Sequence, residues 1–178
     1  MGLPADGLVL WLLPVSWLVH DLEEIATIEW WSRRWKHSER DDISTVQRRL
    51  VRVLASGRRR FALAVALVGC VVVGATVLGV SDPNGVGMVV YITVLGGYFL
   101  HAFVHLGQSI VLRGYTPGLV TAVLLVIPTS VYLYWRLLSA PLLDVEIVIV
   151  TGILGLVVFV PIVVGAKGVA GRLDRWLR

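Results

Sequence analysis

The residues best suited to chemistry are two short histidine patterns that fall inside long apolar runs. The first is His20-x-x-Glu23-Glu24 and the second is His101-x-x-x-His105. Side chains three and four residues apart share one face of a helix, so His101 and His105 lie one turn apart on the same face. His20 shares a face with Glu23 and Glu24 for the same reason, whereas Asp21 points further round the helix and is a weaker candidate. Imidazole and carboxylate together are ligands of zinc, iron and manganese. The two patterns therefore predict a divalent metal site between two helices.

The depth of these residues supports a shared site. Counted from the middle of each apolar run at 1.5 Å per residue, His20 and His101 lie about 3 Å past the centre. Glu24 and His105 each lie about 9 Å past it. An ionised side chain near the bilayer centre costs about 2.5–3.5 kcal/mol, and no Lys or Arg falls within the other apolar runs. A bound divalent ion would offset the charge of Glu23 and Glu24.

Two arrangements of the metal are open. In a mononuclear site the three histidines and Glu24 hold one ion, and Glu23 acts as a base or supports a ligand. In a dinuclear site a glutamate bridges two ions, and Gln108 or water completes the coordination. We expect one ion, with zinc ahead of iron or manganese. A protonated polar network and unrelated packing are the alternatives without metal. Side chains expected to support the ligands or contact a substrate are Gln108, Thr27, Tyr98, Tyr115 and Thr121.

At these residues the chain resembles the bacterial and archaeal membrane family named for its HXXEE motif. The motif here is His20-Asp21-Leu22-Glu23-Glu24. The resemblance extends to His101-x-x-x-His105 in a later apolar run and to Tyr115-Thr116-Pro117-Gly118 at the start of the next one. It implies a polar site within the membrane and does not supply a reaction or a substrate.

The composition defines the scaffold that must position these side chains. Hydrophobic residues make up 57% of the 178 residues and charged residues 16%, against about 45–50% and ~25% in soluble domains. An ordinary soluble domain and a disordered chain are both excluded. The single cysteine excludes an intrachain disulfide. A span needs about 20 apolar residues, and the chain predicts a single all-α membrane domain over residues 1–178. Its five transmembrane helices are expected at about 7–30, 61–80, 86–112, 117–135 and 145–166.

The distribution of Lys and Arg predicts the orientation of these helices. Residues 31–60 hold ten, the 113–116 turn holds one and the segment after Ala166 holds four, while the other side receives Arg136 alone. The positive-inside rule then places the N-terminus outside and the C-terminus in the cytoplasm of a plasma-membrane protein. Pro117 suits the first turn of the fourth span, and Pro128 is expected to kink it.

Residues 31–60 form the one sizeable segment outside the spans. Apolar residues recur there at helical spacing among arginines: Ile43, Val46, Leu50, Val53 and Leu54. The spacing predicts an amphipathic helix on the cytoplasmic leaflet, next to an interfacial belt formed by Trp30, Trp31 and Trp35. Its cations are expected to meet lipid phosphates and not nucleic acid.

Three functions from different classes fit this reading. The first is a metal-dependent hydrolase acting on a lipophilic or membrane substrate, in which Glu23 or Glu24 takes a proton from metal-activated water. An iron site would instead indicate oxidation of a lipid. The second is a proton or cation transporter or sensor that uses the same residues. The third is a non-catalytic partner subunit. The partners expected are the lipid bilayer and a lipophilic substrate, with the oligomeric state left open.

Overall fold

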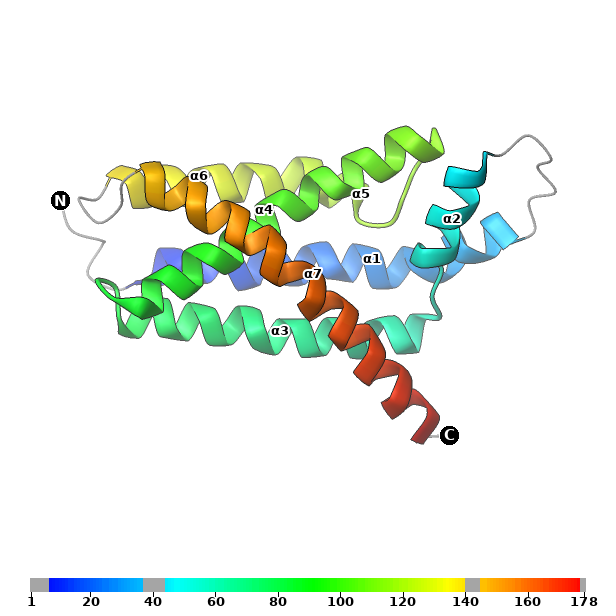
Figure 1. Ribbon diagram of the computed structural model, residues 1–178, viewed down its shortest axis with the longest axis horizontal. Helices are drawn as coiled ribbons and strands as arrows, with labels where there is room; N and C mark the ends of the chain where they lie inside the picture. Colours follow the sequence, from blue (N-terminus) through cyan, green and yellow to red (C-terminus); the bar gives the residue numbers. More distant parts are fainter. Residues whose placement is uncertain (1–6, 37–43, 140–144, 177–178) are drawn as a thin grey trace.

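A computed structural model describes residues 7–36, 44–139 and 145–176, and these residues form an up-and-down helical bundle with no strand among them (Figure 1). The long helices are α1 (Leu12–Lys36), α3 (Arg58–Ser81), α4 (Val86–Leu112), α6 (Ile127–Ser139) and α7 (Val145–Trp176). The shorter elements are η1 (Leu8–Trp11), α2 (Thr45–Leu54), α5 (Leu119–Thr121) and the π-helical segment η2 (Ala122–Val126). The all-α prediction is confirmed.

Among the described residues, four helical stretches are long and apolar enough to cross a membrane: α3, α4, the run Leu119–Ser139 and α7. α1 covers most of the predicted span 7–30. It is not one of these four stretches, because it contains too many acidic residues. The outward surfaces carry large apolar side chains, including Leu18, Val77, Ile110, Leu124 and Val157. Such a surface would be unstable in water and suits contact with lipid. The chain is therefore a helical membrane protein.

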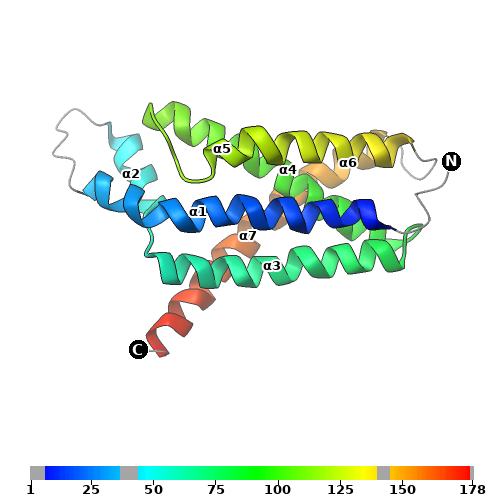
Figure 2. The same ribbon diagram turned by 180° about the vertical axis from the view of Figure 1, so that it is seen from behind.

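The bundle is held together by a central core and by a close crossing of α4 and α7. We call this crossing, at Gly96 of α4 and Gly152 and Gly155 of α7, the glycine seam. α4 packs most closely against α7, where a Cβ added to Gly96 would lie 2.7 Å from the Cα of Gly152. Small residues at this crossing let two backbones approach, as is common between membrane helices. α1 lies between α3 and the continuous helical stretch that includes α5 and α6 (Figure 2). Tyr91, fully buried in the core, donates a hydrogen bond to the Leu10 carbonyl at 3.0 Å.

Two helix ends differ from the limits expected for the membrane spans. Pro117 precedes its helix, because α5 begins at Leu119 after Gly118, which adopts a left-handed conformation. The last helix does not end near residue 166 but continues to Trp176 through several basic residues, since Lys and Arg are good helix formers. The π-helical segment η2 ends immediately before Ile127 and Pro128. Proline removes a backbone donor from its helix, and a π-turn next to it accommodates the change.

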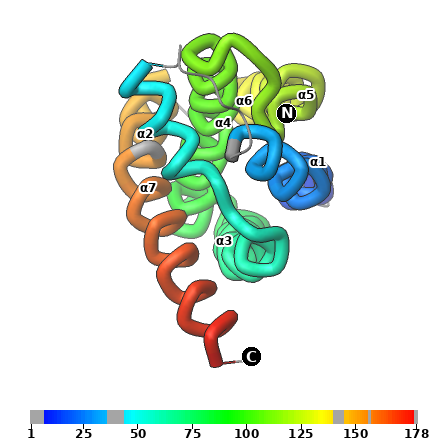
Figure 3. Tube along the Cα trace, turned by 90° about the vertical axis from the view of Figure 1, so that its right-hand side faces the viewer, coloured from blue at the N-terminus to red at the C-terminus, as the bar shows by residue number. Residues whose placement is uncertain are grey.

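Within the segment 31–60 the described residues include one short helix, α2. α2 begins with a capping box, in which Ser44 and Gln47 exchange hydrogen bonds between side chain and backbone. Ile43 lies outside the described residues. Leu50 and Leu54 pack toward Trp31 and the end of α4, while Val53 is 71% exposed. α2 lies across one end of the bundle, as the end view shows (Figure 3).

Candidate metal centre

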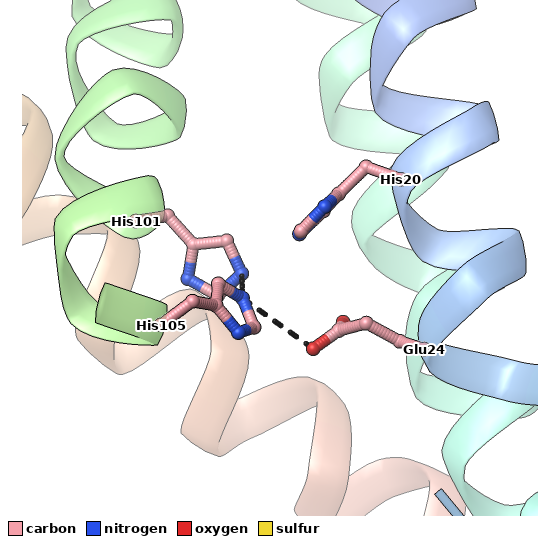
Figure 4. Close-up of side chains that lie close together, drawn as sticks. All are labelled: His20, Glu24, His101 and His105. Atoms are coloured by element: carbon pink, nitrogen blue, oxygen red, sulfur yellow. Dashed lines mark hydrogen bonds and ion pairs between the residues drawn. The ribbon is translucent and has the colours of Figure 1, made fainter. Parts of the chain in front are cut away.

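Four side chains from two helices converge on one point inside the bundle. His20 and Glu24 project from α1, and His101 and His105 project from α4 toward them (Figure 4). One nitrogen or carboxylate oxygen from each of these residues lies within 4.8 Å of the others. We call these four residues the His/Glu cluster. The four ligands of a tetrahedral zinc ion, with bonds of about 2.1 Å, lie roughly 3.4 Å apart. The cluster can therefore hold a metal ion after small side-chain movements.

The hydrogen bonds of the cluster leave ligand atoms without partners. The Nε2 atoms of His101 and His105 lie 2.8 Å apart, and the Oε1 atom of Glu24 lies 3.5 Å from Nε2 of His105. Nε2 of His20 is buried and has no hydrogen-bond partner among the described residues. A buried polar atom without a partner costs about 1–3 kcal/mol. A cation at the centre of the cluster would satisfy this lone pair.

The tautomer of His20 follows from a chain of hydrogen bonds behind it. The Thr121 hydroxyl lies 2.5 Å from Oε2 of Glu23, to which it donates, and 2.8 Å from Nδ1 of His20. A hydroxyl has one proton to give, so Thr121 accepts the bond from Nδ1 of His20. Nε2 of His20 then carries a lone pair directed at the cluster. Metal-binding histidines are commonly oriented by such a bond on the second ring nitrogen.

Glu23 lies behind the cluster and not in it. Its Oε1 accepts a hydrogen bond from the Tyr115 hydroxyl at 2.7 Å and a longer one from the Val120 N–H. Its Oε2 accepts bonds from both the backbone and the hydroxyl of Thr121. Both carboxylate oxygens are therefore engaged by α5 and the turn before it. Of the two glutamates expected to act in catalysis, Glu24 is the one at the cluster, and Glu23 orients His20 through Thr121.

The turn before α5 closes over the cluster through a glycine. Gly118 has a φ of +82° and caps α5. A Cβ at this position would lie 2.9 Å from carbon atoms of Glu24, His20 and His105. Ordinary contacts between carbon atoms begin near 3.5 Å, so a larger residue would press on three of the four cluster side chains. Backbone conformation and space both require glycine here.

A second anchor ties this turn to α1. The indole Nε1 of Trp31, which is buried, donates a hydrogen bond to the Tyr115 carbonyl at 2.9 Å. The Tyr115 hydroxyl also lies 3.3 Å from the hydroxyl of Thr27. Burial, with the neighbouring carboxylate of Glu23, raises the pKa of the Tyr115 phenol to about 12. Tyr115 therefore stays protonated and remains a donor throughout the physiological pH range.

Three of the four cluster residues, Glu24, His101 and His105, line a cavity of about 340 Å³ between α1, α2, α3, α4 and α7. Asp21 and Lys167 line the same cavity. No Lys or Arg lies within the other expected spans, but α7 continues past residue 166 and brings Lys167 to the wall of this cavity. Asp21, which helical periodicity turned away from the cluster face, is 7% exposed and faces the cavity beside Glu24.

The remaining predicted side chains surround the cluster at different positions. Gln108 lines the cavity, and the Tyr98 ring lies edge-on to His20 with centroids 6.2 Å apart. Sequence reasoning missed Asp21, Gly118 and Lys167. The signal for Gly118 was its position directly after Pro117, since glycine after proline is typical of a turn with positive φ.

The comparisons with known proteins agree with the motif. The family model described as a protein of unknown function with an HXXEE motif matches residues 11–133. This stretch contains the whole His/Glu cluster and the turn that covers it. No match was found among curated proteins or among solved structures. The chain belongs to the HXXEE family.

Proposed function

We propose that this protein is a membrane-embedded metalloprotein that holds one divalent ion, zinc in the first instance, in its His/Glu cluster. The observation that carries the proposal is the convergence of four ligand atoms within 4.8 Å. The buried lone pair of His20, fixed by Thr121, supports it. Three neutral imidazoles and one carboxylate are a common ligand type for zinc, and iron or manganese accept the same donors.

We also propose that α1 is a fifth transmembrane helix, with its acids facing the bundle. The three segments rich in Lys and Arg are then cytoplasmic, and the N-terminus is outside. These segments meet at one end of the bundle, since α1, α4 and α7 run in the same direction (Figure 1). In this arrangement α2 lies at the cytoplasmic leaflet, with the exposed Val46 directed toward the lipid.

The reaction that best suits such a site is hydrolysis of a lipophilic substrate. A zinc ion, when bound, polarises a carbonyl or phosphoryl oxygen and activates water. The protein excludes bulk water with the Gly118 turn and orients His20 through Thr121. Asp21, which faces the cavity but does not belong to the cluster, is placed to accept a proton there.

Metal analysis of the purified protein tests the proposal. We expect about one zinc ion per chain in the wild type, and its loss in His20→Ala, His101→Ala and Glu24→Gln. Glu29→Gln is the matched control on α1, because Glu29 is partly exposed and pairs with Arg33 and not with the cluster. The control should keep its zinc.

Zinc binding that survives in all three cluster variants would overturn the proposal. A wild type that stays free of metal after incubation with zinc, iron or manganese would also overturn it. If its carboxyl groups then titrate by infrared spectroscopy, a proton relay becomes the better interpretation. Melting curves of each variant separate loss of the site from loss of the fold. Chelation should lower the melting temperature of the wild type, because an ion that binds the folded form stabilises it.

A further inference from the structure

The cavity beside the His/Glu cluster changes character along its length. Its deep end, toward the bilayer centre, is lined by apolar residues that include Trp17, Val68 and Phe159. Its other end, near the termini of α1 and α4, adds Gln108 and Lys167 to further apolar residues such as Ile28 and Leu54. On α4 the lining runs from residue 97 to residue 108, which corresponds to about 16 Å along the helix axis. The cluster lies between the two ends.

This order of surfaces matches one molecule lying along the cavity. A volume of about 340 Å³ is near the lower limit for small-molecule sites. A largely apolar cavity that carries Gln108 and Lys167 toward one end fits one hydrocarbon chain with a head group. The orientation is that of a lipid in the cytoplasmic leaflet, with its chain toward the bilayer centre.

The charges indicate the sign of the head group. Lys167 is the one basic residue among the described residues that line the cavity. A divalent ion in the cluster would be balanced by the carboxylates of Asp21 and Glu24. Lys167 then gives the cavity one positive charge in excess, and in a low-dielectric site such a charge favours an anionic partner.

We propose that the cavity binds a single-chain amphiphile with an anionic head group, a carboxylate or a phosphate, as substrate or product of the metal site. The head group lies between the cluster and Lys167, and the chain extends toward Trp17 and Phe159. This assignment rests on the proposed metal site and adds the class of ligand to it.

The test uses zinc-loaded protein in phosphatidylcholine nanodiscs, which avoids detergent chains that compete for the cavity. Dodecanoate and dodecyl phosphate are compared with dodecanol and dodecylamine. Fatty acids brominated at the chain end report on binding by quenching tryptophan fluorescence. The saturable quenching should be lost in Trp17→Phe, since Trp17 lines the deep end of the cavity.

Lys167→Gln should weaken binding of the anions about tenfold or more, because it removes a charged hydrogen-bond donor. Dodecanol binding and zinc content should not change. Arg172→Gln is the matched control, as Arg172 is an exposed residue of the same helix and does not line the cavity. The carboxylate and phosphate arms distinguish the two anionic heads. Each added methylene should tighten binding about fourfold until the chain fills the cavity.

Equal binding of dodecanol and the anions by the wild type would overturn the head-group assignment. Quenching that is unchanged in Trp17→Phe would overturn the location. Zinc content is measured in the same samples, so these failures are distinct from failure of the metal site. Protein that holds zinc but binds no chain contradicts only this inference, whereas protein that holds no zinc contradicts the proposed function.

Discussion

Replacing Gly118 by alanine tests the turn that covers the His/Glu cluster. Alanine at a φ of +82° costs about 1–2 kcal/mol in backbone conformation. The new Cβ would lie 2.9 Å from three cluster side chains, roughly 0.6 Å inside ordinary contact, and overpacking of this kind costs about 1–3 kcal/mol. The expected loss of unfolding free energy is therefore about 2–5 kcal/mol.

The same substitution should weaken the metal site. Ligand distances in metal sites tolerate deviations of about 0.2 Å, which is less than the displacement that Gly118→Ala forces on Glu24, His20 and His105. We expect the melting temperature of the zinc-loaded protein to fall by roughly 4–20 °C, and the affinity for zinc to fall as well. Thermal denaturation and zinc titration with a competing chelator measure the two effects.

Gly114→Ala is the control in the same turn. A Cβ at Gly114 would approach no nearer than 3.9 Å to any neighbouring atom, the Leu112 carbonyl oxygen, and Gly114 has no positive φ. Its melting temperature and zinc affinity should match those of the wild type. If Gly118→Ala also matched the wild type in both assays, the turn would not pack on the cluster as described, and the reasoning would be refuted.

Three further predictions concern the side chains behind the cluster. Thr121→Val removes the hydroxyl that accepts a hydrogen bond from His20 and should weaken zinc binding by about tenfold to hundredfold, measured by chelator competition. The raised pKa of Tyr115, about 12, predicts that its contribution to stability is complete below about pH 10 and is lost as the pH rises toward 12. The difference in tyrosinate absorbance between the wild type and Tyr115→Phe reports on Tyr115 alone. It should therefore appear near pH 12 and not near pH 10. Trp31→Phe leaves the Tyr115 carbonyl unpaired and should cost about 1–3 kcal/mol of unfolding free energy, measured against Trp30→Phe, whose ring is 53% exposed.

Each of these predictions has an outcome that would contradict it. Thr93→Val is a control for Thr121→Val, since the Thr93 hydroxyl bonds to a carbonyl of its own helix; equal zinc affinity in the two variants would remove the role of Thr121. A tyrosinate signal from Tyr115 near pH 10 would show that its phenol is solvated. Equal melting temperatures for Trp31→Phe and Trp30→Phe would mean that the bond from the indole of Trp31 does not hold the turn.

The sequence was sufficient to predict the residues that meet at the site. The spacing of His101 and His105 placed both on one helix face, and the equal depth of His20 indicated that α1 would approach them. These inferences depend on helix geometry within one element, and such geometry is nearly independent of the rest of the fold. The helical class followed from periodicity in the same way.

The contribution of α7 to the site could not be predicted in this way. Lys167 reaches the cavity because α7 crosses α4 at the glycine seam and packs against α3, and the crossing depends on contacts between two distant segments. Helical periodicity placed Asp21 off the helix face that carries His20 and Glu24. The sequence could not show that the cavity extends beyond that face and reaches Asp21. Pro117 suits either the first turn of a helix or a turn before a glycine, so the preference of proline alone placed the start of α5 two residues too early.

The glycine seam fixes α7 against α4 at a point far along the helix from Lys167. Gly155 packs against the backbone of α4 at the seam, and Lys167 follows it by twelve residues, or about 18 Å of helix. If α7 tilted by roughly 10° about Gly155, Lys167 would move by about 3 Å, which is close to the length of a hydrogen bond. Any change in the tilt of α7 at the seam would therefore alter the Lys167 end of the cavity more than the parts of α7 next to the seam.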